Sequence, residues 1–373
     1  MLAGIRVIEM GQNVAGPHAA QILSDLGAEV IKVERPGGEE GRKLGPPFVG
    51  DDAAWFYQIN RGKKSVTVDL RDAADLAHFV DLIAGADVFV HNMRPGVLAG
   101  FGLDAATLRG RFPQLIYADI GAFGGHGPMA RRPGYELLMQ AYGGLMSITG
   151  GADAPPTRMG PSIVDLGTGM WAAIGILSAL VRRGATGQGA HVEASLLETA
   201  LGFSGIHIVN YLAAGTMPER SADGFAGLAP YGGMQCADGV LIVGAGNDRL
   251  FAKLADLIER PDWKSDPRFA TNVARVANRA ELHAELDPIF ARGAVADWAA
   301  RLEGAGIPNA PVRTIPELVD DEQVLALGMI SRLNQAGNPA VLGLPLSFDG
   351  ARPALDQPAP RPGEQNDEPW GHS

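Results

Sequence analysis

Apolar runs alternate with stretches of helical periodicity along the first third of the chain. The run Ile5–Met10 contains β-branched residues and predicts a strand, Gly11–Pro17 predicts a loop, and His18–Leu26 has helical spacing. Gly27 stands where a helix usually ends, and Ala28–Glu34 predicts a second strand. This order is a βαβ unit, which implies parallel strands joined by a right-handed crossover.

The same alternation continues beyond this unit. Ser65–Leu70, Val88–Asn92 and Leu115–Ile120 predict further strands, and Ala73–Ala84 and Ala105–Arg111 between them predict helices. Strands that alternate with helices are typical of a parallel sheet covered by helices on both faces. We therefore expect an α/β fold with a doubly wound, Rossmann-like sheet.

The pattern changes after Pro128. Gly-rich loops precede the apolar stretch Leu166–Val181, which is shorter than the roughly 20 residues of a membrane-spanning helix and predicts a buried helix. Met217–Pro230 is rich in Gly, Ala and Pro and predicts a linker, and Tyr231–Val324 has its own pattern of strands followed by helices. The Pro-rich, polar tail Ala351–Ser373 is expected to lie extended on the surface.

Composition narrows the classes of protein that fit. The length of 373 residues exceeds one ordinary core, so we expect two domains or one domain with a large insertion. A net charge of −11 argues against nucleic-acid binding, which needs a basic face. Cys236 is the only cysteine and none of the eight histidines has metal-ligand spacing, so no disulfide and no metal site are predicted. The N-terminus has the pattern of a strand rather than of a signal peptide, and we expect a cytoplasmic protein that does not enter membranes.

The first predicted βα loop lies where doubly wound folds bind nucleotides. It contains Gly11 and Gly16 but lacks G-x-G-x-x-G, so it is either a ligand-binding loop or a tight turn. Basic residues follow several predicted strands, among them Arg35, Lys63 and Arg94. They indicate either a polyphosphate ligand or a solvated surface.

Asp165 stands at the start of the long apolar stretch, in the segment Gly160–Gly169. The dipole of a helix that begins here would keep its carboxylate ionised, which suits a nucleophile. Aspartate is also a frequent N-cap, and the pattern alone leaves both roles open. A serine hydrolase is not supported, because no G-x-S-x-G is present.

Short segments along nearly the whole chain match one known family in order and spacing. They are Leu2–Glu9, Ala15–Pro17, Leu26–Glu34, Asn60–Ser65, Asn92–Gly96, Arg132–Glu136, Thr186–Gly189, Pro230–Gly233, Gly306–Pro308 and Gly363–Glu368. With them the chain resembles the class III CoA-transferases of the CaiB/BaiF type, which include formyl-CoA transferase, carnitine CoA-transferase and the α-methylacyl-CoA racemases. Asp165 falls on the catalytic aspartate of this family.

The resemblance implies a domain organisation. A large Rossmann-like domain would comprise residues 1–205 and, after the small domain, residues 326–373, which include the C-terminal tail. A linker at 206–229 would lead to a smaller α+β domain at 230–325. The family also implies an obligate homodimer of two interlocked rings. Acyl-CoA and a small carboxylic acid would be the substrates, and no permanently bound cofactor is expected.

The resemblance further implies roles for individual residues. Asp165 would form aspartyl anhydride and aspartyl-CoA thioester intermediates. Substrate-positioning roles would fall to Tyr135, Glu136, Gly232 and Gly233. The CoA path would be lined by Asn13, Val14, Ala15, Arg35, Lys63, Asn92, Met93 and Arg94, with Arg35 and Lys63 at the phosphates.

Two alternatives to transfer stay open. A racemase or epimerase of the same family would exchange the α-proton of an acyl-CoA with two bases. Racemases carry a histidine where this chain has Tyr135 and a glutamate where it has Asn247 and Asp248, which favours transfer, because a phenol holds its proton until about pH 10. A non-catalytic nucleotide-binding module is the other alternative. Two departures concern the substrate. Val14 stands where formyl-CoA transferase has a glutamine, and only Gly232 and Gly233 remain of the run of glycines that forms a lid in that enzyme. The resemblance therefore disfavours a formyl or oxalate substrate and does not name the acid.

Overall fold

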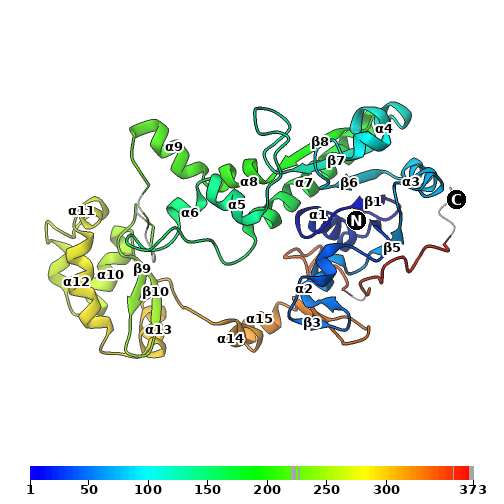
Figure 1. The fold of residues 1–373 in the computed structure, drawn as a ribbon. Helices are drawn as coiled ribbons and strands as arrows, with labels where there is room; N and C mark the ends of the chain where they lie inside the picture. Colours follow the sequence, from blue (N-terminus) through cyan, green and yellow to red (C-terminus); the bar gives the residue numbers. More distant parts are fainter. Residues whose placement is uncertain (219, 221–223, 226, 356, 369–373) are drawn as a thin grey trace. The chain divides into compact units, whose positions relative to one another are not determined.

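The computed structural model describes residues 1–218, 220, 224–225, 227–355 and 357–368. Residues 219, 221–223 and 226 of the expected linker, and 356 and 369–373 of the expected tail, lie outside this set. The chain divides into two compact units (Figure 1). Unit 1 comprises residues 1–145, 158–210 and 325–373, and unit 2 comprises 146–157 and 211–324. The domain bounds expected from the sequence stay predictions.

A six-stranded parallel sheet forms the centre of unit 1. Its strands are β1 (Arg6–Met10), β2 (Glu29–Glu34), β5 (Lys64–Thr67), β6 (Val88–His91), β7 (Ile116–Gly121) and β8 (His191–Ser195). They lie in the order β5-β2-β1-β6-β7-β8, and every neighbouring pair is parallel. Numbered along the chain this is 3-2-1-4-5-6, the order of doubly wound dinucleotide-binding folds. The predicted α/β class and parallel sheet are confirmed.

The strands form where the sequence places continuous apolar runs, because both faces of this sheet are covered. Val7 and Ile8 of β1 and Val88 to Val90 of β6 are fully buried. Glu9 and Lys32 interrupt this pattern, since both are charged and yet fully buried in the middle of the sheet. Their contacts are part of the site described below.

Helices cover both faces of the sheet in unit 1. They are α1 (Ala15–Asp25), α2 (Ala54–Asn60), α3 (Ala73–Ala84), α4 (Ala105–Arg111), α5 (Glu136–Tyr142), α7 (Ile163–Thr186) and α8 (Leu196–Phe203). Short 3₁₀ turns, η1 (Glu40–Lys43) and η2 (Leu98–Phe101), complete the connections. The predicted helices α3 and α4 are confirmed at both ends. Asp72 and Asp104 cap them by accepting hydrogen bonds from backbone amides of the first turn.

Helix α7 is longer than the apolar stretch Leu166–Val181 predicts. It has 24 residues, so by length and composition it could cross a membrane, and the prediction that this segment is too short is wrong. About 44% of its most apolar 18-residue stretch is buried inside the protein, so the helix predicted to be buried is only partly buried. Gly169 lets it approach α1 closely, since a Cβ there would lie 2.8 Å from the carbonyl oxygen of Ala15.

The C-terminal part of the chain completes unit 1. A hairpin of β12 (Ile330–Arg332) and β13 (Ala340–Leu342) places Leu333 and Val341 in a small core with Phe56 of α2. The tail then reaches the edge strand β5, and its contacts there are the amide of Ser65 with Gln365 Oε1 at 2.6 Å and the amide of Thr67 with Asn366 Oδ1 at 2.8 Å. A two-stranded ribbon of β3 (Phe48–Val49) and β4 (Asp52–Ala53) lies between η1 and α2 in sequence.

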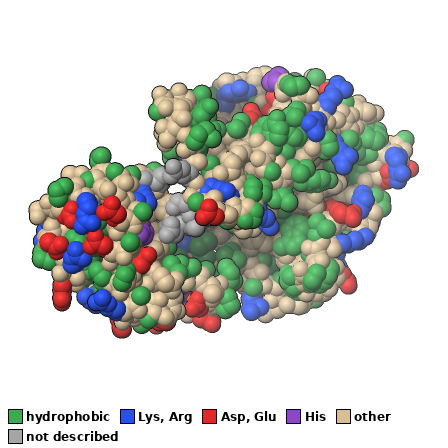
Figure 2. All heavy atoms as spheres, turned by 60° about the vertical axis from the view of Figure 1, so that its left-hand side comes forward, with side chains coloured by type: hydrophobic (Ala, Val, Ile, Leu, Met, Phe, Trp, Pro, Cys, Tyr) green, Lys and Arg blue, Asp and Glu red, His purple; other side chains and the backbone are tan. Residues whose placement is uncertain are grey.

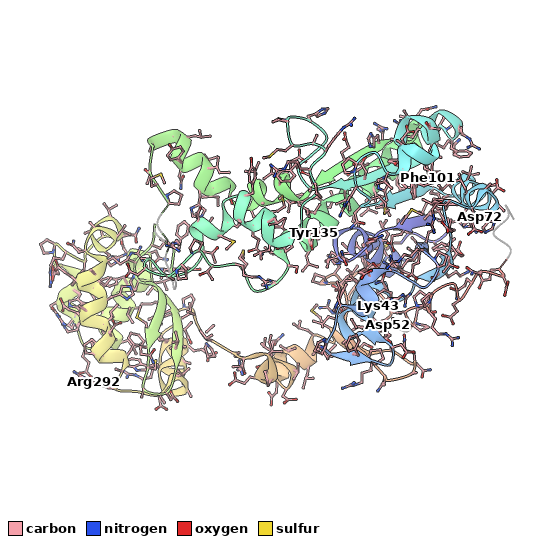
Figure 3. All side chains as sticks on the ribbon, in the orientation of Figure 1. Lys43, Asp52, Asp72, Phe101, Tyr135 and Arg292 are labelled. Atoms are coloured by element: carbon pink, nitrogen blue, oxygen red, sulfur yellow. The ribbon has the colours of Figure 1, made fainter. Side chains whose placement is uncertain are left out.

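Unit 2 is built around an antiparallel sheet in the order β11-β10-β9. Its elements are β9 (Tyr231–Gln235), β10 (Val240–Gly244), α10 (Asp248–Leu257), η3 (Pro261–Lys264), α11 (Asn272–Ala277), α12 (Arg279–Phe290), α13 (Val295–Gly304), β11 (Asn309–Pro311), α14 (Ile315–Val319) and α15 (Glu322–Ala326), which ends in unit 1. Trp263, Phe251 and Leu286 are fully or almost fully buried in its core. Arg292 marks this unit in Figure 3. The short helices α6 (Leu145–Ile148) and α9 (Gly205–Ala214) cross the bounds between the units.

Candidate active site

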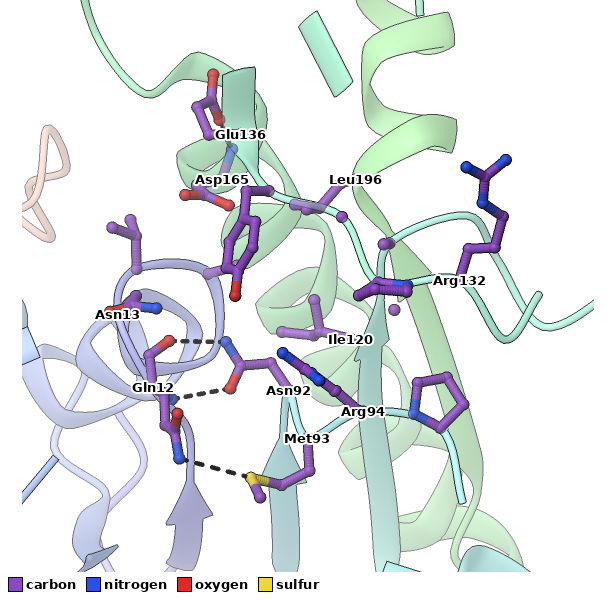
Figure 4. A pocket seen from close by; sticks show the side chains of 18 of the residues that line it. Gln12, Asn13, Asn92, Met93, Arg94, Ile120, Arg132, Glu136, Asp165 and Leu196 are labelled. Atoms are coloured by element: carbon purple, nitrogen blue, oxygen red, sulfur yellow. Dashed lines mark hydrogen bonds between the residues drawn. The ribbon is translucent and has the colours of Figure 1, made fainter. Parts of the chain in front are cut away.

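A cavity of about 380 Å³ opens in unit 1 where the strand order reverses (Figure 4). Strands β1 and β6 are neighbours, and their connections leave in opposite directions, which places a crevice outside their carboxyl ends. The cavity is lined by Gln12, Asn13, Val14, Ala15, Asn92, Met93, Arg94, Pro95, Val97, Ile120, Gly121, Ala122, Arg132, Pro133, Gly134, Tyr135, Glu136, Asp165 and Leu196. Most of the predicted site residues are therefore brought together in one place. We call this cavity the switch-point pocket.

Asp165 lines the switch-point pocket from the first turn of α7. The N-cap of this helix is Ser162, so the alternative that Asp165 is the N-cap is wrong. Burial, and after it the negative charge of Glu136, raises the pKa of Asp165 to about 7. The carboxyl group is therefore only partly ionised at neutral pH, which differs from the expectation that it stays ionised.

Glu136 at the start of α5 binds the beginning of α7. Its carboxylate accepts hydrogen bonds from the backbone amide of Asp165 at 2.6 Å and from that of Val164 at 3.3 Å. The Gln140 amide donates to the same carboxylate at 2.6 Å. Backbone amides of a first helical turn lack partners within the helix, and a carboxylate is a strong acceptor for them. Glu136 thus holds the residue that carries the candidate nucleophile.

Tyr135 directly precedes α5 (Figure 3), and it lines the same pocket. Its side chain is largely exposed. The glycine before it is required, since a Cβ on Gly134 would lie 2.8 Å from the Cβ of Ala122. Gly232 and Gly233 belong to β9 of unit 2, paired with Val243 and Ile242 of β10, and they are not among the residues that line the switch-point pocket. Their positioning role stays a prediction.

Asn92 holds the first loop rather than pointing freely into the pocket. Its Oδ1 accepts a hydrogen bond from the Gln12 amide at 2.8 Å, and its Nδ2 donates to the Gln12 carbonyl oxygen at 2.8 Å (Figure 4). Met93 contributes its sulfur to a 4.0 Å contact with the Gln12 side chain. Arg94 points across the pocket, whereas Arg132 points away from it (Figure 4).

A second cavity of about 380 Å³ adjoins the first loop on its other side. Gln12 and Met93 line both cavities, and Arg35 lines the second. The guanidinium of Arg35 lies 2.6 Å from the Glu40 carboxylate, and both side chains are mostly exposed. An exposed pair of this kind contributes little stability, so Arg35 can exchange Glu40 for another anion at low cost.

Lys63 lies beneath the first loop and lines neither cavity. Its ammonium is fully buried and donates to Glu9 Oε2 at 3.0 Å, to the Asn60 side chain at 2.9 Å and to the Pro17 carbonyl at 2.8 Å. Burial lowers the pKa of Lys63 to about 8, although the Glu9 carboxylate opposes this effect. The predicted contact of Lys63 with a phosphate would require these three bonds to break.

Three further basic residues of unit 1 are also buried. Lys32, Arg42 and Arg61 are buried in ion pairs with carboxylates of unit 1. For these residues both interpretations offered by the sequence are wrong, because they form neither an exposed polyphosphate-binding surface nor a solvated surface. Some partners are near in the sequence, such as Glu34 for Arg42, and others are far, such as Asp25 for Arg61. The pattern of charges alone does not show which carboxylate each cation binds.

A third cavity of about 560 Å³ lies at the β7–β8 edge of the sheet. Asp119, His191 and Glu193 line it, and their ligand atoms lie within 4.8 Å of one another, a grouping that sequence spacing did not predict. The imidazole of His191 is already hydrogen-bonded to Asp119 at 2.8 Å. This contact joins two of the three residues, and the expectation that no metal is bound stays a prediction.

Comparison with known proteins decides the family. The sequence profile described as CoA-transferase family III matches residues 2–366. The chain belongs to this family. Among curated relatives, succinyl-CoA:glutarate CoA-transferase of Mus musculus is 36% identical over 97% of this chain and 84% of that protein. Acetyl-CoA:oxalate CoA-transferase of Acetobacter aceti is 37% identical over 96% of this chain and 91% of that protein.

Solved structures agree with this family membership. A CaiB/BaiF family protein from Brucella suis has a TM-score of 0.87 and 38% sequence identity, and the match covers 98% of this chain and 97% of that one. The resemblance found in the sequence and the expectation of an enzyme of the CoA-transferase class are thereby confirmed. The alternative of a non-catalytic nucleotide-binding module is not supported.

Sequence reasoning missed two residues that support the first loop, Glu9 and Glu39. Glu9 and Glu39 are almost fully buried and accept hydrogen bonds from the backbone of the first loop. One signal was present in the sequence. Glu9 in β1 and Lys32 in β2 each stand between apolar residues of a strand, and buried charges require partners.

Proposed function

We propose that the protein transfers coenzyme A from an acyl-CoA to a small carboxylic acid through covalent intermediates on Asp165. The supporting observation is the position of the Asp165 carboxylate. It lines the switch-point pocket and, among the residues that the structure describes, receives no hydrogen bond from another side chain. A carboxylate held in this way is available to attack a thioester carbonyl.

The first half of the reaction loads the enzyme. A carboxylate oxygen of Asp165 attacks the carbonyl carbon of the acyl-CoA, the C–S bond breaks, and CoA leaves as a thiolate. The product is a mixed anhydride between the acyl group and Asp165. The thiolate then attacks the aspartyl carbon of the anhydride, the donor acid leaves as a carboxylate, and an aspartyl-CoA thioester forms.

The second half repeats these steps in the reverse order. The acceptor carboxylate attacks the aspartyl thioester, expels the CoA thiolate and forms a second anhydride. The thiolate attacks the acceptor carbonyl, and Asp165 leaves as a free carboxylate. Every intermediate keeps the energy of the original thioester, so water must be excluded while the anhydrides exist. The burial that raises the pKa of Asp165 reflects such a water-poor position.

The two cavities beside the first loop would together receive the CoA thioester. Asn13, Val14 and Ala15 line the switch-point pocket next to Asp165 and would contact the pantetheine arm. Met93 lies between this pocket and the second cavity, where Arg35 would bind a phosphate in place of Glu40. Arg94, which points across the switch-point pocket, offers a second cation for the ligand.

Mass spectrometry of the intact protein with a panel of acyl-CoAs, quenched with hydroxylamine, tests this proposal. Hydroxylamine should convert the activated Asp165 to a hydroxamate, which adds about 15 Da to the peptide with this residue. The Asp165→Asn variant should remain unmodified. Modification of other carboxylates with Asp165 untouched would refute the assignment.

A short dicarboxylic acid is the first acceptor to test. The names of the two relatives above specify glutarate and oxalate as acids. We therefore propose succinate, glutarate and oxalate as the first acids in the panel. The oxalate arm also tests the expectation from Val14 that oxalate is a poor substrate.

Racemisation or epimerisation of a 2-methylacyl-CoA is the second candidate, and one observation favours it. A carboxyl group whose pKa is about 7 suits proton transfer at neutral pH. The residues described as lining the switch-point pocket include no histidine that could be the second base. Incorporation of solvent deuterium at the α-carbon, with no acid added, would identify this activity.

We infer that the protein acts as a homodimer, which the apolar surface of unit 1 supports. Met170, Trp171 and Ile174 of α7 are each about half exposed, at 52%, 52% and 49%. Helices α5 and α8, which contact α7, add exposed Leu138 and Phe203. Apolar side chains also lie among charged ones on the face drawn in Figure 2. Exposed apolar side chains on packed helices are typical of a protein–protein interface.

A further inference from the structure

Three consecutive backbone amides of the first loop are each bound by a side chain from elsewhere in unit 1. The donor and acceptor pairs are Gly11 N with Glu9 Oε1 at 2.7 Å, Gln12 N with Asn92 Oδ1 at 2.8 Å, and Asn13 N with Glu39 Oε2 at 2.9 Å. In many nucleotide-binding loops at this place in the fold, such amides are left for the phosphates of the ligand. Here the protein itself occupies them.

The two carboxylates belong to a buried network of charges. The Lys32 ammonium lies 3.1 Å from Glu9 Oε1 and 2.9 Å from Glu39 Oε1, and it also donates to the Gly11 carbonyl at 3.1 Å. Lys63 pairs with the other oxygen of Glu9. Burying so many charges costs solvation energy, and apolar residues often stabilise a core as well. A role in shaping the loop explains why charged residues stand here.

The loop needs this support because its conformation is strained. Asn13 has a φ of 59°, in the left-handed region that residues other than glycine rarely adopt. Gly11 has no room for a side chain, since a Cβ there would lie 2.5 Å from Glu9 Oε1. The loop backbone and the Glu9 carboxylate are thus packed directly against each other.

We propose that Glu9, Glu39 and Asn92 are positioning residues that hold the first loop in the shape that receives the CoA thioester. Glu9 lines none of the three cavities and acts only through the loop. This inference rests on the proposed function for the identity of the ligand. A loop held in its bound shape loses little entropy on binding, which is how the three residues strengthen the affinity for the ligand.

The variant Glu9→Gln tests the proposal because it keeps the size of the side chain and removes its charge. Hydrogen–deuterium exchange of the peptide that contains residues 11–13 should become faster by about tenfold, since the loop opens more often. Isothermal titration with CoA should show a dissociation constant raised by about tenfold. The effect on kcat at saturating acyl-CoA should be smaller than the effect on KM. The variant Glu39→Gln should act in the same direction, and it serves where Glu9→Gln does not fold.

Asp25→Asn is the matched control. Asp25 forms an equally buried ion pair with Arg61, with side-chain exposures of 5% and 3%, and it makes no contact with residues 11–13. This control should leave both the loop exchange and the CoA affinity unchanged. Wild-type loop exchange in both glutamate variants, or equal weakening of CoA binding in Asp25→Asn, overturns the proposal. If the wild-type protein does not bind CoA, the proposed function fails, and loop exchange still decides whether the three side chains hold the loop.

Discussion

The carboxylate of Glu136 lies beside that of Asp165 and accepts a hydrogen bond from the Asp165 backbone amide at 2.6 Å. One residue therefore has two effects on the candidate nucleophile. It holds the first turn of α7 in place, and its negative charge adds to burial in raising the pKa of Asp165. Both effects can be measured separately.

The pH dependence of transfer should report the ionisation of Asp165. Only the carboxylate form is a nucleophile, and its pKa is about 7. We expect kcat/KM for the acyl-CoA to rise with pH through a midpoint near this value. Initial rates between pH 5 and pH 9 would check this. A profile that is flat down to pH 5 would show that Asp165 is ionised throughout.

Glu136→Gln should shift this midpoint to lower pH. The substitution removes a negative charge near Asp165 but keeps an oxygen that can accept the backbone hydrogen bond. Glu198→Gln is the control, because Glu198 binds Ser195 at the start of α8 and does not line the switch-point pocket. If both variants move the midpoint equally, the specific effect of Glu136 is disproved.

Asp165→Asn should abolish transfer and stabilise the fold above neutral pH. We expect kcat to fall by about 10⁴-fold or more, with CoA binding retained. The pKa of Asp165 is higher in the folded protein than the ordinary aspartate value, so ionisation removes stability as the pH rises from about 4 through 7. Asparagine does not ionise, so the Asp165→Asn variant does not lose this stability as the pH rises. At pH 8 a gain of about 1 kcal/mol would raise Tm by about 2–4 °C.

Calorimetry at pH 5 and pH 8 separates this effect from a general change in packing. The gain of Asp165→Asn over the wild type should grow as the pH increases. If the variant and the wild type differ in stability by the same amount at both pH values, the burial of the Asp165 charge is not the cause of the difference. Transfer by Asp165→Asn at the wild-type rate would show that Asp165 is not the nucleophile.

Gly11→Ala should destabilise unit 1 by about 1–3 kcal/mol. The added methyl group would lie 2.5 Å from Glu9 Oε1 and 2.7 Å from Pro17 Cδ. Gly110→Ala is the control, since its Cβ meets nothing within 4 Å and the residue lies in helix α4. That change should stabilise the protein by about 0.5–1 kcal/mol. Urea unfolding of both variants measures the difference, and similar values for the two would contradict the steric argument.

The double substitution of Trp171 and Ile174 by glutamate should dissociate the homodimer. The two side chains are half exposed and lie three residues apart on one face of α7. Light scattering during gel filtration should give the mass of one chain instead of two. Val273→Glu, at an 80% exposed position on α11, is the control and should stay dimeric. A wild-type protein that elutes as a monomer would exclude the homodimer.

Local signals predicted the secondary structure well, because each of them acts within a few residues. The helices at Ala73–Ala84 and Ala105–Arg111 were expected at their observed ends, and an aspartate directly before each one caps it. The length of α7 was underestimated. At its N-terminal end the helix begins at Ile163, before the apolar stretch, and the first-turn amides of Val164 and Asp165 donate to Glu136. At its C-terminal end the helix continues to Thr186, and Gly187 in the left-handed conformation terminates it.

The electrostatics of the site depends on contacts that the sequence does not show. Lys63 was expected at a phosphate, but its partner Glu9 is 54 residues away, and only the parallel sheet brings the two together. Asp165 was expected to be ionised, but burial and the charge of Glu136, 29 residues away, raise its pKa to about 7. The place of Asp165 in the pocket, by contrast, followed from the family resemblance.

The contact between the C-terminal tail and the edge strand β5 has a consequence for how the protein is made. Gln365 and Asn366 bind a strand that was synthesised about 300 residues earlier. A ribosome releases these two residues about 300 residues after the strand that they bind. Until then β5 keeps an open edge, at which a second unfinished chain can pair, so shortening the tail should increase aggregation during synthesis.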